Sequence, residues 1–308
     1  MNQRILLIDN DSFTQSLIKD VFVNERYDVV IASTGIEGLK KVYSDYPSLV
    51  LVNYKLPDIN GLEIVKEIRK NPLLSHLPIV MIIDLEVPSI ENQIYQVGVN
   101  DCIKKPISST VLLLEVRSLL MKRTELVSNI TPTLNLPGSY VLQKEIEEKL
   151  EKQEKFGILY CEISNFEYYN EIYGSQKSEE VIKFTFNIFR QSITYPSSKI
   201  FHITTNSFCI LCLPENVSLI GNRVVESFNK GILNYYSKED EERGCLVIKE
   251  QNGNLKNLPL MNICVVGASN VETPFSNYGE VAKVMFELIN YAKRFSQSIF
   301  IMNRRKRV

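Results

Sequence analysis

The N-terminal part of the chain alternates between short apolar runs and longer segments with helical periodicity. Runs rich in Ile, Leu and Val predict strands at residues 5–8, 27–32, 49–53, 79–83 and 101–104. Apolar residues spaced three or four apart predict helices at residues 12–24, 35–44, 62–70, 89–97 and 108–122. Five strand–helix repeats predict an α/β fold with a doubly wound, five-stranded parallel sheet.

The ends of these predicted strands carry the first group of candidate site residues. In doubly wound sheets, sites form just beyond the carboxyl ends of the strands. The residues expected at that edge are Asp9, Asn10, Asp11, Asn53, Ile83 and Lys105. Asn53 ends the third strand, where this strand–turn–helix layout usually displays a carboxylate.

The second half of the chain mixes strands and helices without strict alternation. The stretch "NITPTLNLPGS", residues 129–139, marks a boundary because Pro and Gly interrupt the helical pattern. Beyond it we expect helices at 140–153, 179–195, 217–236 and 278–294, and strands at 156–163 and 298–302. A turn is expected before residue 179. The run "IFHITTNSFCILCL", residues 200–213, predicts a hairpin. After the polar stretch "SKEDEERG", residues 237–244, Asn252-Gly253 between β-rich flanks predicts another. This pattern indicates an α+β fold with a long hairpin insertion.

Composition agrees with a soluble protein of two domains. The chain has 308 residues, 44% hydrophobic and 23% charged, with a formal net charge of −1. A net charge this close to zero creates no long-range electrostatic field that would attract nucleic acid. The basic cluster at residues 304–307 is expected to be a solvated end of the chain. The N-terminus shows no signal-peptide layout and no apolar run long enough for a membrane span, so we expect a cytoplasmic protein.

The six cysteines are expected to be free thiols. Cys209 and Cys212 form a C-x-x-C, but they lie in a predicted strand, where residues three apart point to opposite faces. They are therefore not expected to share a metal.

Residues 1–124 resemble the receiver domain of response regulators, a flavodoxin-like fold. The resemblance rests on "ILLIDND", "LVLVNYKLPDINGLE", "LPIVMII" and "GVNDCIKKPI", in that order. It implies that Asp9 is the first of two metal-binding acids, that Asn10 replaces the second, and that Asp11 is a partial substitute. It also implies that Asn53 occupies the phospho-acceptor position and Ile83 the hydroxyl position. Lys105, before Pro106, matches the family.

The chemistry at these positions predicts a pseudo-receiver that is not phosphorylated. Phosphoryl acceptance needs an anionic nucleophile, and a carboxamide such as that of Asn53 is a very poor one. Mg²⁺ also prefers carboxylate oxygens, so the change at Asn10 weakens its binding. We expect Lys105 to be solvated or paired with Asp9. The scaffold could mimic either a resting or an activated state.

Residues 134–308 resemble a GGDEF domain, the diguanylate cyclase fold, with residues 125–133 as a helical extension or linker. The resemblance rests on "TLNLPGS", "CEISNFEYYNEIYGS", "FHITTNSF" and "LINYAKRFSQSIFIMNRR". It places Thr204, Thr205, Asn206, Ser207 and Phe208 at the five signature positions. The glycine positions that the family packs under phosphates thus carry threonines. Glu162 takes the place of another metal ligand, and Lys293 of a late lysine. Asn170 and Glu179 fall at guanine-contacting positions. The Arg-x-x-Asp inhibition motif aligns with Tyr195 and Ser198 and is absent.

These departures predict a non-catalytic signalling protein that acts through protein–protein interaction, with no cofactor. Binding of Mg²⁺ and GTP is expected to be lost or weak. Other signalling proteins are the expected partners, with a homodimer as one arrangement. One alternative is a sensor that binds a guanine nucleotide or cyclic dinucleotide through Asn170, Glu179 and Lys293 without turnover. Another is an atypical diguanylate cyclase. A purely structural role for Asn170 and Glu179 is the alternative to nucleotide binding: they would belong to a polar helix start and turn that are retained for folding.

Overall fold

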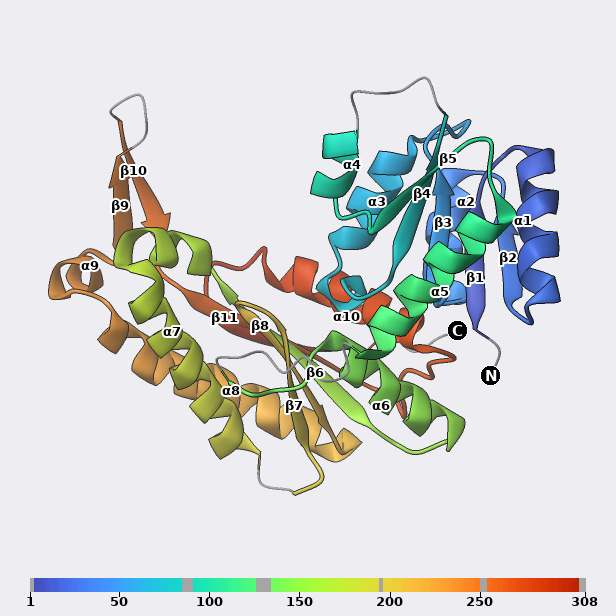
Figure 1. The fold of residues 1–308 in the computed structure, drawn as a ribbon. Coiled ribbons are helices and arrows are strands. Elements are labelled where there is room, and N and C mark those ends of the chain that lie inside the picture. Colours follow the sequence, from blue (N-terminus) through green and yellow to red (C-terminus); the bar gives the residue numbers. More distant parts are fainter. Residues whose placement is uncertain (1–2, 85–90, 126–133, 194–195, 250–253, 305–308) are drawn as a thin grey trace. The chain divides into compact units, whose positions relative to one another are not determined.

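The structure, a computed structural model, describes residues 3–84, 91–125, 134–193, 196–249 and 254–304 (Figure 1). It divides into two units. The first contains Met1–Asn129 together with Ser276–Lys283, and the second contains Ile130–Phe275 and Val284–Val308. Parts of several expectations lie outside the described residues: the start of the helix at 89–97, most of the 125–133 linker, Tyr195, the Asn252-Gly253 turn and the basic residues 305–307.

The first unit is built on a parallel sheet of five strands in the order β2-β1-β3-β4-β5. The strands are β1 (Arg4–Ile8), β2 (Asp28–Ala32), β3 (Leu49–Asn53), β4 (Ile79–Ile83) and β5 (Asp101–Lys104). Every residue of β3 and β4 is buried, as expected for the centre of a sheet covered on both faces. The predicted α/β fold and all five predicted strands are confirmed.

Helices cover both faces of this sheet. They are α1 (Ser12–Asn24), α2 (Gly35–Ser44), α3 (Gly61–Arg69), α4 (Glu91–Gln96) and α5 (Ser109–Glu125), with a short 3₁₀ turn, η1 (Pro72–Leu74), before β4. Figure 1 shows α1 and α5 together on one face and α2 and α3 on the other. Asp58, in the loop after β3, accepts hydrogen bonds from the backbone of Gly35 and Ile36 and so caps α2 from a neighbouring loop.

The second unit has a mixed sheet of five strands and a separate two-stranded hairpin. The sheet order is β12-β11-β6-β8-β7, and only the β11–β12 pair is parallel. The strands are β6 (Gly157–Ser164), β7 (Lys199–Thr204), β8 (Ser207–Cys212), β11 (Asn262–Ser269) and β12 (Ile299–Met302). The inserted hairpin pairs β9 (Cys245–Lys249) with β10 (Leu255–Pro259). The predicted α+β class and hairpin insertion are confirmed.

The helices of this unit differ from the sequence prediction in two places. They are α6 (Ser139–Glu151), α7 (Phe166–Ser192), α8 (Val217–Gly231), α9 (Lys238–Arg243) and α10 (Tyr278–Ala292), with 3₁₀ turns η3 (Pro214–Asn216) and η4 (Ile232–Tyr235). The turn expected before residue 179 is wrong, because α7 already starts at Phe166 and only bends at Gly174, whose φ is 80°. The stretch at 237–244, expected only to be polar, contains α9. Ser237 caps that helix and Gly244, at φ 70°, ends it.

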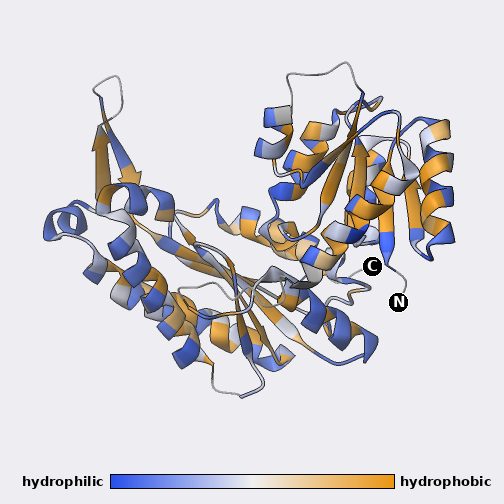
Figure 2. Cartoon of the chain, in the orientation of Figure 1, coloured by the Kyte–Doolittle hydropathy of each residue, from blue (hydrophilic) through white to orange (hydrophobic). Residues whose placement is uncertain are grey.

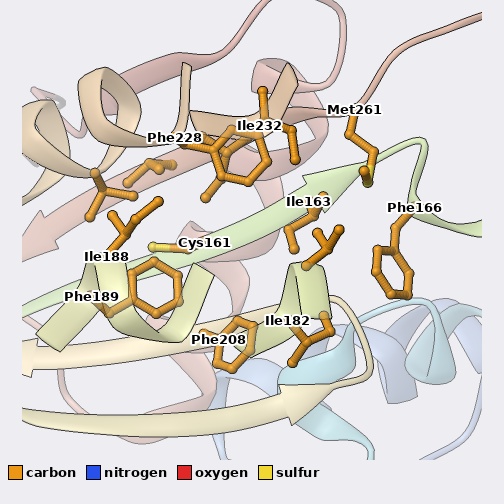
Figure 3. Close-up of a cluster of buried hydrophobic side chains, with 14 of the residues drawn as sticks. Cys161, Ile163, Phe166, Ile182, Ile188, Phe189, Phe208, Phe228, Ile232 and Met261 are labelled. Atoms are coloured by element: carbon orange, nitrogen blue, oxygen red, sulfur yellow. The ribbon is translucent and has the colours of Figure 1, made fainter. Parts of the chain in front are cut away.

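Each unit has its own hydrophobic core (Figure 2). In the first, Ile18 and Phe22 of α1 and Val116 of α5 pack on Ile5 and Leu51 of the sheet. In the second, the core lies between the sheet and helices α7 and α8. Figure 3 shows Phe189, Phe208 and Phe228 in that cluster. Within the described residues, no helix combines the length and apolarity needed to cross a membrane.

Candidate functional site

The first cluster of candidate residues lies at the carboxyl ends of β1, β3 and β5 and centres on Asp9. Asp9 follows β1 and is fully buried, and Asn53 ends β3 and is 6% exposed. Asn53 donates a hydrogen bond from Nδ2 to Oδ1 of Asp9 at 3.0 Å. The same Asp9 oxygen accepts the backbone N–H of Asp11 at 2.9 Å. We call Asp9, Asn53 and Lys105 the carboxyl-edge cluster.

Both polar atoms of the Asn53 amide form hydrogen bonds. Its Oδ1 accepts the backbone N–H of Lys55 at 3.2 Å, so its nitrogen faces Asp9. A carboxylate in this place has no hydrogen to donate and would set two negative charges about 3 Å apart. Asparagine therefore satisfies Asp9 without a cation between the two side chains.

Lys105 lies near both acids of the β1 end. Its Nζ is 3.7 Å from Oδ2 of Asp9 and 3.8 Å from Oδ2 of Asp11. Oδ2 of Asp9 is buried and has no hydrogen-bond partner, so Lys105 is the charge that compensates it. The structure thus places Lys105 beside Asp9, as one of the two sequence expectations had it.

Asp11 serves mainly as the N-cap of α1. Its carboxylate accepts the hydroxyl of Thr14 at 2.6 Å and the backbone N–H groups of Phe13 and Thr14. The Thr14 hydroxyl, followed by these backbone donors and the charge of Lys105, lowers the pKa of Asp11. Asn10 is exposed beside it, and Ile83, at the end of β4, is buried. The hydrogen bonds of the Asp11 carboxylate are therefore mainly those of a helix cap.

An ion pair that the sequence did not indicate links two loops at the same edge. Lys55, after β3, lies 2.9 Å from Asp84, after β4. Both side chains are substantially exposed, so the pair contributes little stability. Asp84 directly follows Ile83, the residue at the position where the receiver resemblance expects a hydroxyl.

The second cluster lies in the second unit and centres on Glu162 of β6. Its Oε1 is 2.5 Å from Nζ of Lys293, just beyond α10, and the Glu162 side chain is only 12% exposed. The phenol of Tyr160 reaches Oε2 of the same carboxylate at 3.4 Å. Burial, and then the negative charge of Glu162, raise the pKa of Tyr160 well above its usual value. Glu162 is therefore already neutralised by a cation of its own chain.

The hairpin between β7 and β8 borders this cluster. Ser207 pairs with Glu162 across β8 and β6, and Cys264 pairs with Glu162 across β11 and β6. The hydroxyl of Thr204 lies 2.6 Å from that of Ser207 and donates to Oδ1 of Asn206 at 3.1 Å. We call Glu162, Lys293 and residues 204–207 the hairpin cluster.

The turn of this hairpin does not require glycine. Asn206 donates to the backbone carbonyl of Ile163 at 2.9 Å, which ties the turn to β6. None of residues 204–207 has a positive φ, so the β-branched Thr204 and Thr205 fit the backbone without strain. Thr205 is exposed at the tip. Side chains thus stand at the two positions where the resemblance expects bare backbone under phosphates.

Phe208 belongs to the core rather than to the hairpin cluster. It is fully buried, packs edge-on against Phe189 and stacks on His202 of β7 at 4.5 Å between ring centroids. His202 is 6% exposed, and its Nδ1 has no hydrogen-bond partner. Burial lowers the pKa of His202.

The two residues at guanine-contacting positions lie on exposed parts of α7. Asn170 precedes the bend at Gly174 and Glu179 follows it. Glu179 pairs with Lys183 at 2.8 Å, one turn further along the helix.

The sequence reasoning missed two neighbours of Glu162 and one pairing. Tyr160 lies two residues before Glu162 on the same face of β6, so the period of two in a strand could have indicated it. The position of Cys264 depends on the pairing of β11 with β6. The contact with Lys293 depends on how α10 packs. Neither follows from sequence spacing.

The cysteines behave as expected for structural thiols. All six are free, and Cys161, Cys209, Cys212 and Cys264 are buried in the sheet. Burial is the main cause that raises the pKa of Cys212, to about 12. No group of three or more His, Cys, Asp or Glu side chains suited to a metal ion occurs among the residues that the structure describes.

Comparison with known families and proteins finds a match in each half of the chain. Residues 5–117 match the response regulator receiver domain, and residues 135–242 match the GGDEF domain of diguanylate cyclases. A Haemophilus influenzae protein described as a transcriptional regulatory protein CpxR homolog is 31% identical over 129 residues, 42% of this chain and 55% of that protein. The polar-differentiation response regulator DivK of Brucella abortus is 25% identical over 120 residues, 39% of this chain and 98% of that protein.

A solved structure also resembles part of the chain. A CheY-like receiver domain from Methanospirillum hungatei is 27% identical, with a TM-score of 0.39, and the match covers 41% of this chain and 98% of that one. This chain spans about half the length of the Haemophilus influenzae relative.

Proposed function

We propose, for a chain that carries a response regulator receiver domain followed by a GGDEF domain, that it is a non-catalytic signalling protein that acts through protein–protein contacts. The domain architecture belongs to two-component and cyclic-di-GMP signalling. The finer proposal is that the receiver is not phosphorylated and that the GGDEF domain does not form cyclic di-GMP. We place the protein in the cytoplasm.

The observation that carries the proposal is that the acid of each cluster is already bonded to side chains of its own unit. Asp9 accepts from Asn53 and is compensated by Lys105, and Glu162 is paired with Lys293. Metal-assisted phosphoryl transfer needs acids that are free to hold a cation, and that cation neutralises the transferred charge.

The residues present do not fit Mg²⁺ in either cluster. Mg²⁺ takes near-octahedral oxygen ligands and is usually held by one or two carboxylates. In the receiver, Asp11 caps α1 and Asn53 turns its nitrogen toward Asp9. In the hairpin cluster, Glu162 is the single carboxylate, and an ammonium group lies 2.5 Å from it. No catalytic step is assigned to either site.

The nucleophile position gives a second, independent support for the receiver. Asn53 carries a neutral amide whose nitrogen and oxygen are both engaged in hydrogen bonds. It cannot form the acyl phosphate that an aspartate would form.

Two assays on the full chain test this function. The chain is incubated with a small-molecule phosphodonor and Mg²⁺ and weighed intact, and separately with GTP and Mg²⁺ or Mn²⁺, with the products separated. We expect an unchanged mass and no cyclic dinucleotide. A stable gain of one phosphoryl group, or product above that of a Glu162→Gln control, would overturn the proposal.

A nucleotide-binding sensor is the second candidate. It is supported by the exposure of Asn170 and Glu179 on the two parts of α7, which leaves both side chains accessible to a base. Thermal-shift titrations with GTP, GDP and cyclic di-GMP, run on the wild type and on Asn170→Ala, test it. A shift that disappears in the variant supports the sensor, and no shift at millimolar ligand excludes it.

A further inference from the structure

The two outer strands of the second unit's sheet, β7 and β12, are protected differently. The outer side of β7 is closed by the segment that enters the unit. The backbone N–H of His202 donates to the carbonyl of Pro137 at 2.9 Å, and Leu134 and Leu136 of the same segment pack against the core. β7 also begins with an exposed lysine, Lys199. Among the described residues, none forms a backbone hydrogen bond with the outer side of β12.

The pairing of β12 with β11 shows which of its backbone groups face outward. The two strands are parallel, with Met302 opposite Gly267, and the N–H of Asn303 donates to the carbonyl of Gly267 at 2.7 Å. The N–H and C=O of one residue point to the same side of a strand, and successive residues alternate between the two sides. Phe300 and Met302 therefore direct their N–H and C=O groups away from β11. We call this outer side of β12 the β12 edge.

The side chains of β12 are apolar on both faces of the sheet. All four residues, Ile299–Met302, are half-buried. Natural proteins usually guard an edge strand of this kind with lysine, proline or a bulge, because its unpaired backbone groups are a template for another strand. The outer strand β10 of the inserted hairpin follows that rule with Lys256 and Pro259. β12 has neither residue type, so the β12 edge is suited to pairing.

The aromatic ring of Phe300 holds β12 firmly on the unit. The ring occupies the space over two glycines, Gly221 of α8 and Gly267 of β11. A Cβ atom at Gly221 would lie 2.4 Å from the ring, and one at Gly267 would lie 3.2 Å from it. The strand is therefore held in place before any partner arrives. A preformed edge loses little conformational entropy when another strand pairs with it.

The sequence on both sides of β12 is strongly basic. Residues 288–308 include six Lys or Arg residues and no Asp or Glu. Lys293 is paired with Glu162, whereas Arg294 and Arg304 are exposed, and Arg304 lies just after β12. Opposite charges favour association and like charges oppose it. A second copy of β12 would bring the same positive charge, so the charge favours an acidic partner.

We propose that the β12 edge binds an extended, acidic segment of a partner protein as an added strand. The backbone of the segment bonds to the N–H and C=O groups of Phe300 and Met302, and its apolar side chains extend the two faces of the sheet. Its acidic residues are attracted by the charge of Arg304. The inference rests on the proposed role in protein–protein contact and names the surface and the class of partner. Its tests use neither a phosphodonor nor GTP, so it can fail independently of that function.

The first test measures hydrogen exchange at single amides of the full chain. The amides of Phe300 and Met302 should exchange about tenfold faster than that of Ile301, which faces β11. An excess of the probe peptide acetyl-Glu-Asp-Val-Thr-Val-Thr-Val-Asp-Glu should slow exchange about tenfold at Phe300 and Met302 and leave Ile301 nearly unchanged. Equal exchange at the three amides without peptide would show that the edge is already covered and would overturn the proposal. Protection that increases with protein concentration alone would assign the edge to a second copy and would also overturn it.

The second test measures binding of the same peptide, labelled with fluorescein, by fluorescence anisotropy. Met302→Pro removes one outward N–H and keeps the bonds to β11, so we expect about fivefold weaker binding. Met302→Leu keeps that N–H and should bind like the wild type, and circular dichroism confirms that both variants are folded. Arg304→Glu leaves the backbone intact and should weaken binding most at low salt. No binding at millimolar peptide, or equal binding by the wild type, Met302→Pro and Arg304→Glu, would overturn the proposal.

Discussion

The carboxyl-edge cluster and the hairpin cluster neutralise a central acid in different ways. Asp9 is fully buried and depends on an amide hydrogen from Asn53 and a more distant ammonium group, 3.7 Å away. Glu162 is partly exposed and is in direct contact with Lys293. In the carboxyl-edge cluster, the neighbouring side chain of Asn53 replaces a second carboxylate. In the hairpin cluster, the compensating Lys293 lies just beyond α10, on a different element from Glu162. An acid can thus be neutralised either by the residue that ends the neighbouring strand or by a lysine that is distant in the sequence.

The largest expected effect follows from removing the buried acid. Asp9→Ala leaves the Nδ2 group of Asn53 without its acceptor and leaves Lys105 with only the more exposed Asp11, 3.8 Å away. Removal of one member of a buried charged pair costs about 3 kcal/mol or more. We expect a loss of about 3 kcal/mol in the free energy of unfolding of the first unit, measured by urea denaturation. Asp20→Ala, at an exposed position of α1, is the control. A loss below about 1 kcal/mol would show that Asp9 is not the centre of this cluster.

The next effect concerns the nucleophile position. Asn53→Asp replaces a hydrogen-bond donor by a second carboxylate about 3 Å from Asp9, and we expect it to lower stability at pH 7 by about 1–2 kcal/mol. It should not restore phosphorylation, because Asn10 and Ile83 still lack the acid and the hydroxyl. The triple variant Asn10→Asp, Asn53→Asp, Ile83→Thr should gain phosphate from a small-molecule donor with Mg²⁺.

Intact mass and urea denaturation measure the two parts of this prediction separately. Phosphate on the single variant would mean that the site had lost only its nucleophile. An increase in stability of the single variant in metal-free buffer would mean that the bond from Asn53 to Asp9 does not stabilise the unit.

A smaller effect is expected in the hairpin cluster. Lys293→Met removes the ammonium group from Glu162, but the lysine is 42% exposed, so solvent compensates part of the loss. We expect a change of about 1 kcal/mol or less in the free energy of unfolding of the second unit. Lys183→Met, at an exposed pair on α7, is the matched control. A loss equal to that of Asp9→Ala would remove the contrast between the two clusters.

The smallest effects are in the pH dependence, where the two units should differ. Burial lowers the pKa of His202, so below about pH 6.5 the unfolded chain takes up a proton that the folded second unit does not. Stability of that unit should therefore fall as the pH falls below about 6.5. His202→Phe, which keeps the stack on Phe208, should flatten this dependence.

The first unit should respond at lower pH. The backbone N–H groups of Ile36 and Gly35 lower the pKa of Asp58 to about 2. Its contribution is thus complete above about pH 4 and is lost as the pH falls toward 2. Urea unfolding followed by methyl NMR signals of each unit measures both dependences. If the first unit lost stability between pH 7 and 5 and the second did not, the assignment would be reversed.

Local patterns were enough to predict most elements. Runs rich in Ile, Leu and Val predict the strands of the first unit, and apolar residues three or four apart predict α1 and α2. The structure adds the caps of these two helices, Asp11 and Thr34. The helix α9 was missed although Ser237 and Gly244 are ordinary start and stop signals. Its residues, Lys-Glu-Asp-Glu-Glu-Arg, have no apolar face to indicate a helix.

The contacts of the candidate sites were less predictable than the elements that carry them. The sequence placed Asp9 and Asn53 at one edge because parallel strands end together. It could not show that the Asn53 nitrogen faces Asp9, which depends on the turn at Lys55. The pairing of Glu162 with Lys293 joins β6 to a helix distant in sequence, and its geometry is set by packing alone.

Glu162 is paired with Lys293 and is not free to hold a catalytic cation, so the full chain should not convert GTP into cyclic di-GMP. Purified protein is incubated with GTP and Mg²⁺ or Mn²⁺ over many hours, beside Glu162→Gln and Lys293→Met. We expect no cyclic di-GMP from any of the three proteins. Cyclic di-GMP formed by the wild type and abolished by Glu162→Gln would contradict it.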